Sequence, residues 1–233
     1  MKSALVLSGQ PRCLDQCFES LKRFIIDEYH PDVFFSFWNT SFATPSTELN
    51  KVWYDKENPN WERFDAGYAY KYIHLLHPKR FTVFPQINFD VRLYQHTCTA
   101  ANSRMQAKSY LNVLSMFYSM MQADVCRLEW ERMHNFAYDA VIRCRTDLEF
   151  HATPELTELD KVSVPKDMCY GGLNDQFAFG NSYTMLVYSE CFQSIETLFR
   201  NGTNFHPETL LRDHMKSQNI PVRFIDTPYR IVR

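Results

Sequence analysis

The chain has 233 residues, enough to bury a hydrophobic core in one large domain or two small ones. Its 45% hydrophobic and 22% charged residues are ordinary for a soluble globular protein. The net charge of −2, without runs of like charge, argues against a nucleic-acid-binding tract or a polybasic membrane patch.

The cysteines and the N-terminus indicate where the protein resides. Seven cysteines are an odd number at scattered spacings, which argues against a disulfide framework and a zinc site. The first apolar stretch is too short for a signal peptide, and no apolar run approaches the length of a transmembrane helix. We therefore expect a soluble cytoplasmic protein with no membrane span and no nucleic-acid partner.

Residues 4–7 are expected to form a buried strand, which ends in Ser8, Gly9, Gln10 and, after a proline, Arg12. A glycine directly after a strand lets the backbone turn sharply and approach a ligand. Arg12 could then meet a phosphate. The alternative is a plain turn between a strand and a helix.

The next elements indicate an α/β fold. Apolar residues at helical spacing predict a helix from residue 14 to about Pro31, and a strand follows it. Strand, helix and strand in this order imply a right-handed unit with parallel strands. Over this region we predict strands at 32–38 and 81–84 and a short helix at 68–76.

A long helix is predicted from about 104 to 134, because apolar residues recur there with a period of 3.6. Polar side chains, including Gln106 and Lys108, gather near its start. Free N–H groups and the helix dipole favour an anionic ligand at such a position.

The central polar stretch follows a predicted buried strand over 140–142 and contains Arg143, Arg145, Asp147 and Glu149. Ligands of open α/β sheets bind beyond the carboxyl ends of the strands. Two acids at positions i and i+2 of an extended backbone point to the same side, so we expect both to reach one cation. The arginines could bind phosphate, and buried ion pairing with acids is the alternative.

The rest of the chain supplies further polar candidates. Asp175 lies in a glycine-containing loop, where it is either a functional acid or a turn former. His206 and Glu208 flank Pro207, which marks a helix start. Other predicted elements are strands near 162, at 176–179 and at 221–225, and a helix over 184–199.

Arg143-x-Arg145-x-Asp147-x-Glu149-Phe150, with a long helix before it and Asn174-Asp175-Gln176 after it, resembles the nucleotide-sugar-dependent glycosyltransferases of the GT-A fold. The acid pair looks like a variant of their Asp-x-Asp metal motif, with Glu in place of the second Asp. The resemblance implies one GT-A-like domain over residues 1–233, with a Rossmann-like, mostly parallel central sheet flanked by helices.

The resemblance also implies roles for the candidate residues. Asp175 would be the general base toward the acceptor hydroxyl if the reaction inverts the anomeric centre. The metal would be Mn²⁺ or Mg²⁺, which oxygen ligands favour over zinc, held by Asp147, Glu149 and His206. The acceptor would meet Asn174, Gln176 and Glu208. The nucleotide sugar would meet Ser8, Gly9, Gln10, Arg12, Gln106, Lys108, Arg143 and Arg145.

The expected function is metal-dependent transfer of a sugar from a nucleotide diphosphate sugar, such as a UDP or GDP sugar, to a glycan or glycoprotein acceptor. Small soluble enzymes of this kind occur in bacterial surface-polysaccharide pathways and in large viruses. One alternative is a sugar-phosphate nucleotidyltransferase, although such enzymes usually carry a richer glycine loop after the first strand. The other is a non-catalytic carbohydrate-binding or interaction module that retains the fold.

Overall fold

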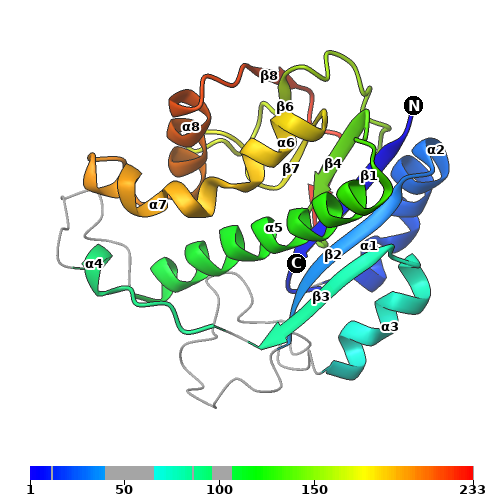
Figure 1. The fold of residues 1–233 in the computed structure, drawn as a ribbon, viewed down its shortest axis with the longest axis horizontal. Coiled ribbons are helices and arrows are strands. Elements are labelled where there is room, and N and C mark those ends of the chain that lie inside the picture. The colour runs from blue at the N-terminus through cyan, green and yellow to red at the C-terminus, as the bar shows by residue number, and fades with distance from the viewer. Residues whose placement is uncertain (12, 40–65, 86, 96–106, 233) are drawn as a thin grey trace.

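The computed structural model describes residues 1–11, 13–39, 66–85, 87–95 and 107–232 (Figure 1). Its centre is a seven-stranded sheet of order β3-β2-β1-β4-β7-β6-β8, in which β7 alone runs antiparallel to its neighbours. The strands are β1 (Ser3–Gly9), β2 (Asp32–Asn39), β3 (Arg80–Pro85), β4 (Ala140–Cys144), β6 (Val162–Pro165), β7 (Phe177–Gly180) and β8 (Val222–Ile225). A second, two-stranded sheet pairs β5 (Leu148–Phe150) with β9 (Tyr229–Ile231).

Helices flank both faces of the main sheet because its strands bury alternate residues on opposite sides. In β1, Ala4 and Val6 join one core cluster, while Leu5 and Leu7 join the other. The first cluster packs under the long α5 (Ala107–His134) and under α6 (Ser182–Ser189), α7 (Cys191–Arg200) and α8 (Pro207–Ser217). The second packs under α1 (Leu14–Leu21), η1 (Lys22–Ile26) and α3 (Ala66–Leu76). Two short helices, α2 (Asp27–Tyr29) and α4 (Arg92–Gln95), complete the described helices.

The structure confirms the predicted α/β class and its mostly parallel sheet. It corrects the prediction of one helix over 184–199, because the chain breaks at Glu190, whose ψ of 2° separates α6 from α7. The apolar spacing continues across this break, so periodicity alone did not reveal it. The antiparallel direction of β7 and the pairing of β9 with β5 were not predicted either.

The described residues also bear on two composition arguments. Six cysteines lie among them, and all six are free thiols. No helix in the described ranges has both the length and the apolar character needed to span a membrane.

The helix α5 is fixed to the carboxyl ends of β1 and β2 by the buried hydroxyl of Ser119. This hydroxyl donates to the carbonyl of Ser36 at 2.8 Å and accepts from the N–H of Gly9 at 2.7 Å. Gly9 has a φ of +103°, a conformation that favours glycine. The helix therefore starts well beyond the strand ends and runs back over the sheet (Figure 1).

A buried ionic network joins α5 to α6 and to the start of β4. The guanidinium of Arg127 is fully buried and contacts both carboxylate oxygens of Asp124, at 2.7 and 2.9 Å. It also pairs with Glu131 at 2.8 Å and donates to the hydroxyl of Ser182 at 2.7 Å. Glu131 in turn accepts from the N–H of Tyr138 at 2.7 Å, just before β4. One arginine thus satisfies two buried acids and aligns three segments.

We expect Arg127→Met to lower the free energy of unfolding by about 3–5 kcal/mol, because it leaves the carboxylates of Asp124 and Glu131 buried without their cation. Denaturant unfolding would measure this loss. Arg132→Met, on an exposed position of the same helix, is the matched control and should cost less than about 0.5 kcal/mol. Equal effects of the two substitutions would contradict a structural role for the network.

Candidate functional site

The strand order reverses between β1 and β4, which are neighbours in the sheet although β2 and β3 lie between them in sequence. The crevice beyond the carboxyl ends at such a switch point is the usual ligand site of open α/β sheets. Ser8 and Gly9 lie at the end of β1, and Arg145 follows β4. Asp175 lies just before β7, which enters the sheet beside β4 at the same edge. Four predicted site residues therefore converge there.

Arg143 lies near the carboxyl end of β4, and its side chain is in the protein interior rather than on the surface. Its side chain is 1% exposed and lies on the face of β4 opposite Ile142 and Cys144. It donates to the backbone carbonyl of Asp175 and lies 3.5 Å from the hydroxyl of Ser8. Its Nε has no hydrogen-bond partner among the described residues. Arg143 thus holds the segment before β7 against β1 and β4.

Arg145 is more accessible and forms a two-point ion pair with Asp147. Its Nε donates to Oδ1 at 2.9 Å, and a terminal nitrogen contacts Oδ2. Its backbone N–H donates to the carbonyl of Gln176 at 3.0 Å. Burial lowers the pKa of Arg145, but the nearby carboxylates of Asp147 and Asp175 outweigh it and raise the pKa overall. The guanidinium therefore stays charged, with 28% of the side chain exposed.

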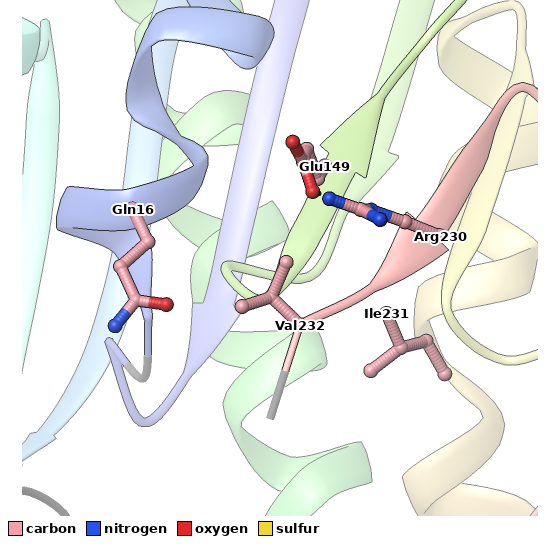
Figure 2. A pocket seen from close by; sticks show the side chains of 5 residues that line it. All are labelled: Gln16, Glu149, Arg230, Ile231 and Val232. Carbon is pink, nitrogen blue, oxygen red and sulfur yellow. Dashed lines mark hydrogen bonds and ion pairs between the residues drawn. The ribbon is translucent and has the colours of Figure 1, made fainter.

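Glu149 pairs with a different arginine. Its carboxylate accepts from Nε of Arg230, on β9, at 2.6 Å. The two side chains line a cavity of about 370 Å³ together with Gln16, Ile231 and Val232 (Figure 2). The extended backbone predicted for both acids is not continuous, because Asp147 lies in the turn before β5 and only Glu149 lies on that strand.

The carboxylates therefore do not form a ready metal site. Both oxygens of Asp147 are bonded to Arg145, and Glu149 is bonded to Arg230. His206, the third predicted ligand, pairs with Glu208 instead. Within the described ranges, no three His, Cys, Asp or Glu side chains come close enough together to hold a metal ion. A cation at Asp147 would first have to displace the guanidinium of Arg145.

Among the acids at these strand ends, Asp175 is the one whose carboxylate is not paired with another described side chain. Its side chain is buried, yet no hydrogen bond or ion pair to its carboxylate is formed by the part of the chain that the structure describes. Its charge acts on Arg145, Glu208 and His206, so it lies in their neighbourhood. This carboxylate is available to accept a proton or a hydroxyl hydrogen bond.

His206 and Glu208 form an ion pair at the start of α8, with Nδ1 and Oε2 2.5 Å apart. Glu208 raises the pKa of His206, although burial opposes this. Burial raises the pKa of Glu208, and the charge of Asp175 adds to this, while His206 acts in the opposite direction. Burial and a neighbouring carboxylate thus make Glu208 hold a proton more tightly than an exposed glutamate does.

The amides predicted to meet the acceptor are used inside the protein. Oδ1 of Asn174 accepts from the N–H of Gln176 at 2.8 Å and from the N–H of Phe177 at 3.3 Å. The hydroxyl of Tyr229 contacts Oδ1 of Asn174 and Oε1 of Gln176, each at 3.2 Å. These contacts fix the loop before β7 and orient Asp175 within it.

The remaining predicted donor residues are less well placed or lie outside the described residues. The carbonyl of Gln10 accepts from the hydroxyl of Thr146 at 2.8 Å, which joins the two strand ends. Arg12, Gln106 and the side chain of Lys108 lie outside the described residues. The backbone of Lys108 lies eleven residues before Ser119, or roughly 16 Å along the helix axis from the end of β1.

The sequence did not single out Tyr188, which lies in the same neighbourhood. Its hydroxyl is buried on α6 without a hydrogen-bond partner among the described residues. Burial raises its pKa, and the charges of Arg143, Asp175 and Glu208 all act on it. In sequence it occupies a regular apolar position of a helix, so no local signal marked it.

The His206–Glu208 pair makes the unfolding free energy depend on pH. Because the pKa of His206 is raised in the folded state, the pair's contribution is complete below the ordinary value of about 6.5 and is lost as the pH rises through the folded value. A histidine NMR titration should give a pKa above about 6.5 in the wild type and a lower one in Glu208→Gln. Glu155→Gln, which removes an exposed acid, is the control. An unchanged titration of His206 in Glu208→Gln would refute the pairing.

The comparisons with known proteins identify the chain only at the level of a family. Residues 73–233 match a family described as a domain of unknown function, DUF7796. The matched range includes β4, the loop before β7 and the start of α8, but not β1. Among curated proteins, none matches the chain. Since the match covers more than half of the sequence, the chain belongs to the DUF7796 family.

Proposed function

We propose that the protein is a glycosyltransferase that uses a nucleotide diphosphate sugar and binds it at the β1/β4 switch point. The observation that carries this proposal is the convergence there of the end of β1, Arg145 and the uncommitted carboxylate of Asp175. A cation beside an available acid at a strand edge suits a substrate that has a diphosphate at one end and a reacting carbon at the other. We also propose that its fold is of the GT-A type.

In this proposal each residue has a distinct task. Arg145 neutralises charge on the diphosphate as the bond from the sugar's anomeric carbon to the phosphate oxygen breaks. Asp175 takes the proton of the acceptor hydroxyl as that oxygen bonds to the anomeric carbon. Arg143 touches neither substrate and is a positioning residue, because it holds the carbonyl of Asp175. The products are the glycosylated acceptor and the nucleoside diphosphate.

A divalent cation could take part in the proposed transfer. Bound Mn²⁺ or Mg²⁺ would supply a further positive charge at the phosphates. Because Asp147 and Glu149 are each bonded to an arginine, we assign no step to the cation.

Donor binding is tested by the change in Tm with UDP or GDP, each with and without Mn²⁺. One nucleotide at a hundred times its Kd should stabilise the wild type by about 2.7 kcal/mol. Arg145→Gln should abolish this shift, whereas Arg200→Gln, which removes the same charge from an exposed ion pair on α7, should preserve it. If Asp147 binds a cation, the shift requires Mn²⁺ and disappears in Asp147→Asn. If no nucleotide raises Tm under either metal condition, the proposal is wrong.

The role of Asp175 is tested by release of the nucleoside diphosphate from a panel of sugar donors and acceptors. We expect Asp175→Asn to lower kcat by about 10²–10⁴-fold, the usual contribution of a general base, with little change in the KM for the donor. Asp160→Asn, at an exposed position, is the control. If Asp175→Asn keeps the wild-type kcat, another residue is the general base.

A non-catalytic carbohydrate-binding module is the second candidate function. The two ion pairs Arg145–Asp147 and Arg230–Glu149 favour it, because acids satisfied within the protein are not free to bind a metal. Binding of sugars without binding of any nucleotide would identify this function.

A further inference from the structure

The connection between β6 and β7 places an exposed aromatic ring beside the polar group at the start of α8. Tyr170 is 69% exposed, although it is a large aromatic residue. Its ring contacts that of His206, with centroids 6.2 Å apart and planes at 61°. His206 is paired with Glu208, and the charge of Asp175 acts on both. An apolar surface and several hydrogen-bonding groups therefore lie together.

The backbone at Tyr170 is in a conformation that tyrosine disfavours. The N–H of Gly172 donates to the carbonyl of Cys169 at 2.7 Å, which closes a four-residue turn. Its central residues, Tyr170 and Gly171, have φ of 41° and 84°, the signs of a type I′ turn. Asn-Gly is the preferred pair in such a turn, and bulky residues are rare there. Since the ring is mostly exposed, packing into the core does not explain why it occupies this position.

Contacts with α8 hold the turn in place. The N–H of Leu173 donates to the backbone carbonyl of Glu208 at 2.9 Å. A Cβ on Gly172 would lie 1.9 Å from that carbonyl oxygen, so only glycine permits this approach. Arg212 donates to the carbonyl of Gly171 at 2.5 Å. The ring is therefore attached to the same element that carries the His206–Glu208 pair, and little ordering is required on binding.

We propose that Tyr170 is the stacking platform of a sugar-binding subsite, with the acids beside it directed at the sugar hydroxyls. A pyranose has an apolar C–H face, which packs on an aromatic ring, and hydroxyls that donate to carboxylates. Glu208 is held beside the ring: its side chain is 6% exposed, and its Oε2 pairs with Nδ1 of His206, the residue whose ring contacts Tyr170. The identification of this sugar as the acceptor rests on the proposed function.

The test compares Tyr170→Asn with Tyr170→Phe. Asparagine suits the turn but lacks the ring, and phenylalanine keeps the ring, so the pair separates folding from stacking. Binding of a panel of methyl glycosides, measured by saturation-transfer NMR and calorimetry, should weaken at least about tenfold in Tyr170→Asn, which is the loss of about 1.4 kcal/mol expected for one ring contact. Binding should persist in Tyr170→Phe. Tyr183→Asn, which removes another exposed ring on α6, should change nothing.

Nucleotide binding, measured on the same variants, separates this subsite from the transferase proposal. Ring-dependent sugar binding without nucleotide binding would support the platform and overturn the transferase. Nucleotide binding with equal sugar affinities in the wild type and Tyr170→Asn would overturn the platform alone. A wild type that binds none of the glycosides, with or without UDP or GDP, would also overturn it.

Discussion

A buried guanidinium at the centre of the sheet is the constraint that positions the groups at the carboxyl ends of β1 and β4. Arg143 projects from β4 into the interior, where a charge must find acceptors because water is excluded. It finds the carbonyl of Asp175, and the hydroxyl of Ser8 lies nearby. Separation of the segment before β7 from β4 would leave this charge with fewer partners. One side chain therefore fixes Asp175 relative to the β1/β4 switch point.

The edge beyond Arg143 is organised by paired charges. Asp147 forms an ion pair with Arg145, two residues before it, and Glu149 forms an ion pair with Arg230 of β9. The first pair is partly buried, so it orients both groups more firmly than an exposed pair would. The second pair lies on the wall of the cavity that Gln16 of α1 also lines (Figure 2). The two acids therefore have separate structural roles, although only Leu148 separates them in the sequence.

Glu208 joins the loop before β7 to α8 in two ways. Its backbone carbonyl accepts from Leu173 and lies against Gly172, while its side chain pairs with His206. The turn that carries Tyr170 is thereby fixed to the helix whose first residues lie within the electrostatic reach of Asp175. Binding groups held by a helix and a tight turn keep their geometry before a ligand arrives, which lowers the entropy cost of binding.

The sequence by itself determined the α/β class, most strands and helices, and the region where polar residues meet, because periodicity and turn residues are local properties. It identified Arg143, Arg145 and Asp175 as neighbours of a strand end. Only the tertiary structure decided which arginine pairs with Asp147 and which with Glu149, since Arg230 comes from a strand 81 residues later. It also decided that Asn174 points inward and that Tyr170 lies beside His206. These contacts depend on strand order and helix packing, which link residues distant in sequence and leave no local pattern.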